Sequence, residues 1–120
     1  MKVATASTGY DMNSPISTIF GTSTSFIIAE FENEEITDIS VIKNPAKNKS
    51  GSGSIAAQLM VDNEVNALIT GKLGPVAFLI LKNASIKVYK FTPGSVEKNL
   101  KRFILGKLEE VTTLSGGFPV

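Results

Sequence analysis

The second half of the chain alternates between segments typical of strands and segments typical of helices. Short apolar runs at Val65–Thr70 and Ile86–Phe91 are typical of buried strands. Apolar residues with helical spacing follow each of these runs, and the same spacing begins earlier, at Ile55. Such alternation predicts parallel strands joined by right-handed crossover helices. This pattern constrains the fold most, because it requires a sheet with helices packed on it.

The first half of the chain predicts a meander of strands. Lys2–Ser7 is a short run of strand character, and a long loop rich in Ser, Thr, Gly and Pro follows from Thr8. The runs Ser25–Phe31 and Ile36–Ile42 flank a short polar turn, which indicates a β-hairpin. The predicted order is therefore β-β-β-α-β-α-β-α, with one mixed five-stranded sheet in an α/β fold.

The size of the chain predicts one domain. Its 120 residues are 42% hydrophobic and 19% charged, which is enough apolar material for a core. We expect residues 1–108 to form the domain. Residues 109–120, with weak signals and the Gly116-Gly117 pair, are expected to form a C-terminal tail.

Two missing residue types limit the chemistry. The chain has no Cys, which excludes disulfides and thiolate metal sites, and no His, which excludes Ser-His and Cys-His nucleophile pairs. We therefore expect no catalytic residues and no enzyme. The net charge of +1 does not indicate a nucleic-acid partner, and no apolar run approaches the ~20 residues of a membrane span. The opening MKVATAS is too short and polar for a signal peptide, so we expect a cytoplasmic protein.

Three predicted strand-to-helix loops share a composition that favours a ligand site. The loops Ser50–Ser54, Thr70–Pro75 and Thr92–Ser95 are rich in Gly, Ser, Thr and Pro, and Lys49 and Lys72 add positive charge. In open α/β sheets, ligands bind at the carboxyl ends of the strands, where helix N-termini favour anions. Turns and helix caps use the same residue types, so a structural role stays open. The candidate ligand-binding residues are Ser7, Thr8, Gly51, Ser52, Gly53, Ser54, Gly71, Lys72, Gly74, Thr92, Gly94 and Ser95.

Other sites fit the sequence less well. Gly51–Ala56 matches G-x-G-x-x-A, but no acid follows where a dinucleotide site would hold the ribose. Leu73 follows Gly71-Lys72 where a P-loop needs Ser or Thr. Asp11 and Asp62 fall outside the predicted strands, so a two-metal nuclease is not indicated. The acids in Glu30–Glu35 are interpreted as solvated charges of the hairpin.

Several stretches of the chain resemble one known family. They are MKVATAS, SPISTIFGTSTSFIIAEF, SGSGSIAAQL, NALITGKLGPVAFLIL, IKVYKFTPGSVEKNL and GKLEEV, and the pattern T-G-x-x-G-P-x-A-F followed by I-K-V-Y is the most specific. The chain resembles the nitrogenase iron–molybdenum cofactor biosynthesis family, with NifX and the C-terminal domain of NifB. The resemblance implies a ribonuclease H-like, three-layer α/β domain. It also implies a role in binding or carrying an iron–sulfur or iron–molybdenum cofactor precursor, without catalysis.

The sequence departs from the family at one motif. Family members usually have S-x-H-F-G-R, whereas Ile19 stands here in place of the His and Thr22 in place of the Arg. A cluster ligated by thiolate or imidazole cannot form within one subunit, but a cluster that brings its own ligands could lie as an anion on helix N-termini. The alternative is an interaction module that no longer binds a metallocluster, with Val76–Leu81 or the loop around Phe20 facing a protein partner. The sequence leaves the oligomeric state open.

Overall fold

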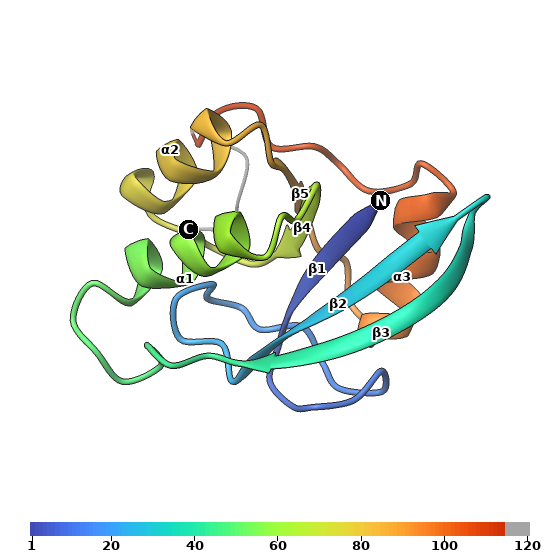
Figure 1. Cartoon of the computed structure of the whole chain (residues 1–120), viewed down its shortest axis with the longest axis horizontal. Helices are drawn as coiled ribbons and strands as arrows, with labels where there is room; N and C mark the ends of the chain where they lie inside the picture. Colours follow the sequence, from blue (N-terminus) through green and yellow to red (C-terminus); the bar gives the residue numbers. More distant parts are fainter. Residues whose placement is uncertain (115–120) are drawn as a thin grey trace.

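The computed structural model describes residues 1–114, and it contains one five-stranded sheet with three helices (Figure 1). The strands are β1 (Lys2–Ser7), β2 (Ser25–Glu32), β3 (Glu35–Lys43), β4 (Ala67–Thr70) and β5 (Lys87–Lys90). The helices are α1 (Ser52–Asp62), α2 (Pro75–Asn83) and α3 (Val96–Ile104). The strand order across the sheet is β3-β2-β1-β4-β5. The predicted mixed sheet is confirmed, while the ribonuclease H-like label stays a prediction.

The pairing of the strands places four strand ends at one edge. β1 pairs parallel with β4, and β4 pairs parallel with β5. β2 runs antiparallel to both β1 and β3, so β3 points the same way as β1. Asn33 and Glu34 connect β2 to β3 with φ angles of 51° and 68°, the left-handed geometry of a tight hairpin turn. The carboxyl ends of β1, β3, β4 and β5 therefore lie together.

The helices cover the two faces of the sheet unequally. α1 and α2 lie on one face, over a core that includes Ala4, Ala6 and Leu68 (Figure 1). α3 lies on the other face, where Val96 and Leu100 pack with Val3, Ile27 and Ile69. Successive β1 residues face opposite sides, which explains how one strand serves both cores. The result is three layers, with the sheet in the middle.

The polar segment between β1 and β2 is held against the carboxyl edge. It makes bridges between Ser7 and Ile16, between Pro15 and Ser95, and between Ile19 and Lys72. Phe20 within it is fully buried, with its ring centroid 5.4 Å from that of Phe26. Phe20 therefore offers no exposed surface, because the hydrophobic effect drives its ring into the core. The prediction that the loop around Phe20 faces a partner would therefore depend on its other residues, such as Ile19, which is 49% exposed.

Residues beyond the predicted domain end extend the sheet. The Lys90 N–H donates to the Glu109 carbonyl at 2.9 Å, and the Val111 N–H donates to the Val88 carbonyl at 2.8 Å. The segment thus covers the free edge of β5. The domain boundary at residue 108 stays a prediction, and Gly116-Gly117 lies outside the described residues. Over residues 1–114, no helix is long and apolar enough to cross a bilayer.

Candidate functional site

The first turns of α1 and α2 border one hollow at the carboxyl edge of the sheet. Its volume is about 380 Å³. Three separate segments meet there: the Ser-Gly loop before α1, the loop between β4 and α2, and part of the segment between β1 and β2. The lining residues are Ile19, Phe20, Gly21, Gly51, Ser52, Gly53, Lys72, Leu73 and Gly74.

The start of α1 is open because small residues form it. Gly51 precedes the helix with φ 74°, a left-handed conformation that glycine adopts without strain. A Cβ added at Gly53 would lie 3.6 Å from the Cβ of Ala77, so α1 and α2 approach closely here. In the described chain, no side chain caps either helix N-terminus. The free N–H groups in the first turns can therefore receive a negatively charged group, and in α2 they begin at Val76 because Pro75 has no N–H.

Backbone pairing fixes the third wall of the hollow. The Phe20 N–H donates to the Lys72 carbonyl at 2.8 Å, and the Lys72 N–H donates to the Thr18 carbonyl at 2.8 Å. A Cβ at Gly71 would lie 2.3 Å from the Thr18 carbonyl oxygen, and one at Gly21 would lie 2.6 Å from the Ser52 Oγ. Both glycines are therefore needed for this close packing, which brings the Ile19–Gly21 segment against the first turn of α1.

The hollow favours negative charge. Among the described lining residues, Lys72 is the one charged side chain. Within residues 1–114, neither α1 nor α2 has an acidic residue in its first turn. The positive ends of two helix dipoles and one ammonium group thus act together. No group of three or more His, Cys, Asp or Glu in the described part of the chain could hold a metal ion.

A buried hydroxyl lies close in sequence to this wall. Thr70 ends β4 immediately before Gly71, is fully buried, and its Oγ1 has no hydrogen-bond partner within the described residues. The alternation along β4 places its side chain on the same face as Leu68, the face that α1 and α2 cover. Thr5 has a second unpaired hydroxyl, on the side of Val3 and α3.

The third predicted loop belongs to a different place. Thr92, Gly94 and Ser95 precede α3, on the opposite face of the sheet. The first two amides of the helix, at residues 96 and 97, donate to the Ser14 and Met12 carbonyls at 2.9 Å each. The third amide, that of Lys98, donates to the Ser95 Oγ at 3.2 Å. The N-terminus of α3 is therefore closed by the protein itself.

The Thr92–Ser95 loop is further fixed by side chains of α3. The Asn99 Oδ1 accepts from the Thr92 N–H at 2.8 Å, and its Nδ2 donates to the Thr92 carbonyl at 2.9 Å. Arg102 donates to the Thr92 Oγ1 and to the Pro93 carbonyl. These contacts give the loop a structural role, the alternative that the sequence left open.

The remaining candidate residues lie outside the hollow. Ser7 is fully buried and its Oγ accepts from the Gly9 N–H at 3.0 Å, while the Thr8 hydroxyl donates to the Pro15 carbonyl at 3.2 Å. Ser54 and Gly71 adjoin the hollow without lining it. Sequence reasoning missed Ile19, Phe20, Gly21 and Leu73, although the family motif around Phe20-Gly21 was a usable signal.

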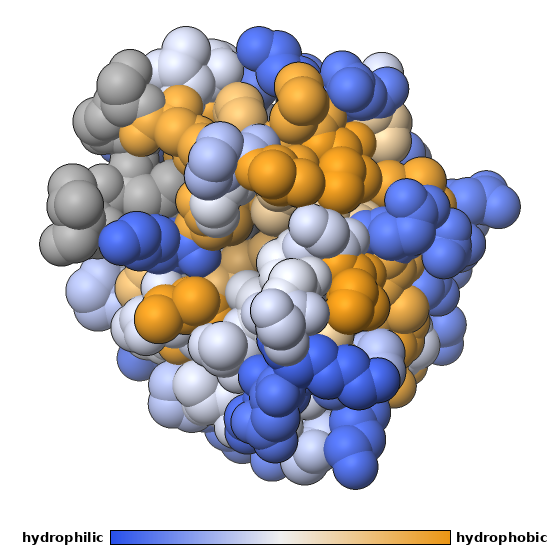
Figure 2. All heavy atoms as spheres, turned by 90° about the vertical axis from the view of Figure 1, so that its left-hand side faces the viewer, coloured by the Kyte–Doolittle hydropathy of each residue, from blue (hydrophilic) through white to orange (hydrophobic). Residues whose placement is uncertain are grey.

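Apolar side chains are exposed at the wall of the hollow and on the two helices that begin there. Ile19 at its wall is 49% exposed, and Val76 and Leu79 on α2 are 59% and 57% exposed. Ile55, in the first turns of α1, is 41% exposed. Figure 2 views the molecule from this side and shows apolar surface between polar groups. We call these four residues the apolar rim.

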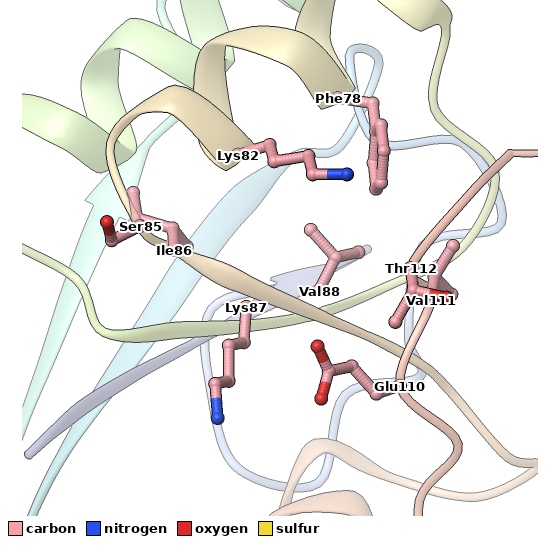
Figure 3. Close-up of a pocket in the computed structure, with 9 residues that line it drawn as sticks. All are labelled: Phe78, Lys82, Ser85, Ile86, Lys87, Val88, Glu110, Val111 and Thr112. Atoms are coloured by element: carbon pink, nitrogen blue, oxygen red, sulfur yellow. The ribbon is translucent and has the colours of Figure 1, made fainter.

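A different hollow of about 280 Å³ lies between α2, β5 and the segment that follows α3 (Figure 3). Phe78 and Lys82 reach into it from α2, with the Lys82 Nζ 5.9 Å from the ring centroid of Phe78. Glu110 and Val111 close it from the C-terminal segment. None of the predicted site residues lines this hollow.

Comparison with known proteins decides the family. The family model for the dinitrogenase iron-molybdenum cofactor matches residues 1–106. The chain belongs to this family. It is 38% identical over 99 residues to an uncharacterized protein of Methanocaldococcus jannaschii, and the match covers 82% of this chain and 84% of that protein.

Solved structures share the fold of this chain. A NifB-like protein from Thermotoga has a TM-score of 0.81 and 36% identity, with 93% of this chain and 94% of that chain covered. The apo form of the orange protein from Desulfovibrio gigas has a TM-score of 0.85 and 25% identity, with 92% of each chain covered. The predicted kinship with NifB- and NifX-like proteins is confirmed.

Proposed function

We propose that this protein is a non-catalytic carrier that binds an anionic iron–sulfur or iron–molybdenum cofactor precursor in the hollow at the starts of α1 and α2. The observation that carries the proposal is the meeting of two uncapped helix N-termini with Lys72 in one hollow. Membership of the iron-molybdenum cofactor family supports the identity of the cargo. The cargo must arrive with its own ligands, because the chain has no Cys or His.

The walls of the hollow suit a cargo that is held rather than transformed. Glycines at 51, 53 and 74 let a large group approach the backbone amides, and no side-chain base in the described lining could activate a nucleophile. Backbone N–H groups bind an anion without changing it, and Lys72 adds a flexible charge. Release then requires only that a partner compete for the anion.

The test is anaerobic loading. The purified protein is incubated with an iron–sulfur cofactor precursor, desalted, and assayed for bound iron and visible absorption. We expect wild type to retain cluster and Lys72→Gln to bind it roughly three- to ten-fold more weakly. Gly53→Leu should lose the cluster, because the new side chain would crowd Ala77 and disturb the close approach of α1 and α2 at the hollow. Gln58→Leu, on the exposed side of α1, is the matched control for Gly53→Leu and should retain cluster. A colourless, iron-free wild type would refute the carrier role.

A second function is favoured by the apolar rim. Val76 and Leu79 are more than half exposed on a helix whose other apolar residues enter the core, which is typical of a surface that meets a partner. In this alternative the protein is an interaction module without a cluster. In that case, substitution of both residues by Ser should abolish a stable complex with the protein partner. Wild type itself should bind no iron.

A further inference from the structure

A second hollow lies at the same edge, beside the end of β3. Its volume is about 620 Å³. It is separate from the hollow at α1 and α2, since the two share no lining residue. The lining residues are Tyr10, Thr24, Lys43, Asn44, Pro45, Lys47, Asn48 and Lys49.

The loop that carries the lysines is fixed by a buried amide. Asn44 is 3% exposed, and its Nδ2 donates to the carbonyls of Gly21 at 3.0 Å and Ser23 at 2.9 Å. Its Oδ1 accepts from the N–H of Ala46 at 3.0 Å, and the Ala46 side chain is fully buried. Asn44 and Ala46 thus point inward, and the residues between and after them are exposed.

Hydrogen bonds and strand pairing also fix the opposite wall of this second hollow. The Ser25 hydroxyl donates to the carbonyl of Gly9, which fixes the backbone next to Tyr10. Ser25 also pairs with Lys43 across β2 and β3. The Lys47 ammonium group donates to the Thr24 Oγ1 at 2.9 Å, so it already lies over the hollow.

The hollow concentrates positive charge. Lys43, Lys47 and Lys49 line it, and no carboxylate among the described residues does. Asp11, next to Tyr10 in sequence, accepts hydrogen bonds from its own loop at Asn13 and Ser14. Like charges held around one concavity repel each other and focus the field on an anion.

Five of the 11 acidic residues lie toward the other end of the same strands. They lie on or near the turn of the β2–β3 hairpin, and Glu35 at this turn is about 25 Å along β3 from Lys43. They are Glu30, Glu32, Glu34, Glu35 and Asp38. Within residues 1–114, none of Lys43, Lys47 and Lys49 forms an ion pair with a carboxylate.

We propose that the hollow between Tyr10 and Lys49 binds a multiply charged anion of the phosphate class. The three ammonium groups neutralise the charge, and the Tyr10 hydroxyl and Asn48 amide supply neutral donors. The volume lies within the range of small-molecule sites. The proposal is independent of the carrier function, because it uses none of the residues that line the other hollow.

The experiment is a titration of the whole chain with inorganic pyrophosphate, followed by amide chemical shifts and by calorimetry at low salt. We expect saturable shifts centred on Tyr10 and residues 43–49, and an affinity that falls as salt is raised. The double variant Lys47→Gln/Lys49→Gln should bind roughly ten-fold more weakly. Lys107→Gln, on the segment after α3, is the charge control and should leave binding unchanged.

Two further measurements distinguish this site from the hollow at α1 and α2 and identify the source of the phosphate. Lys72→Gln should leave pyrophosphate binding unchanged while it weakens loading of the iron–sulfur precursor. ADP tests the source of the phosphate: equal affinity indicates recognition of phosphate alone, and tighter binding with shifts at Tyr10 indicates a nucleotide. No saturable binding, or shifts centred on residues 51–53 and 72–76 instead, would overturn the proposal.

Discussion

The two faces of the sheet begin their helices in opposite ways. On one face α1 and α2 start without a side-chain cap, around a hollow that Lys72 lines. On the other face α3 starts with a Ser95 cap, and carbonyls from the segment between β1 and β2 take its first amides. Helix N-terminal amides need partners. Where the protein supplies these partners, the loop before the helix is structural. Where the protein supplies none, a ligand can bind to the free amides.

The largest loss of stability is expected from a steric clash in the wall of the hollow at α1 and α2. Gly71→Ala places a Cβ 2.3 Å from the Thr18 carbonyl oxygen, so the backbone must move. We expect a loss of about 3 kcal/mol in the free energy of unfolding, measured in urea. Gly74→Ala is the matched control, because a Cβ there meets no described atom within 4 Å, and it should change stability by less than about 1 kcal/mol. Equal effects at both positions would contradict this account.

The next largest loss of stability is expected on the face of the sheet that α3 covers. Asn99→Ala removes a fully buried amide that satisfies both backbone groups of Thr92. Buried groups left without partners are costly, so we expect a loss of about 2–3 kcal/mol in unfolding free energy. Loading of the iron–sulfur precursor by the folded variant should stay unchanged, and a specific loss of loading would show that the two faces are not independent.

A smaller effect is expected at the cap itself. Ser95→Ala deletes the Oγ that accepts from Lys98, which should cost about 1 kcal/mol. Ser52→Ala, in the first turn of uncapped α1, is the comparison, since α1 has no side-chain cap to lose. It should alter stability by less than about 0.5 kcal/mol. Thermal unfolding of both variants measures the difference, and a larger loss at Ser52 would reverse the assignment of open and closed ends.

The smallest expected change in the free energy of unfolding is a gain rather than a loss. Thr5→Val and Thr70→Val each replace a buried, unpaired hydroxyl by a methyl group of similar size. Both variants should be stabilised by about 0.5–1 kcal/mol in urea unfolding, because a desolvated group without a partner is removed. A change in precursor binding is expected at Thr70 alone, on the face of the open hollow. A destabilised Thr5 variant would indicate a partner for its hydroxyl.

The sequence by itself determined which segments are strands and helices, and which sheet edge carries the loops. Apolar periodicity records burial residue by residue, and Gly, Pro and Ser mark the loops locally. The hairpin at Asn33-Glu34 and the helix that begins at Pro75 follow from such signals. These features depend on residues that are close in the sequence, so they could be predicted from the sequence alone.

Only the tertiary structure decided which loops meet. Ser50–Ser54 and Thr70–Pro75 begin helices on one face, whereas Thr92–Ser95 begins a helix on the other. The segment between β1 and β2 made the distinction, since it supplies Ile19–Gly21 to the open hollow and the Ser14 carbonyl to α3. Its polar composition predicted a loop but not its path. That path depends on the burial of Phe20 and on backbone pairing with residues far along the chain, which local sequence patterns do not encode.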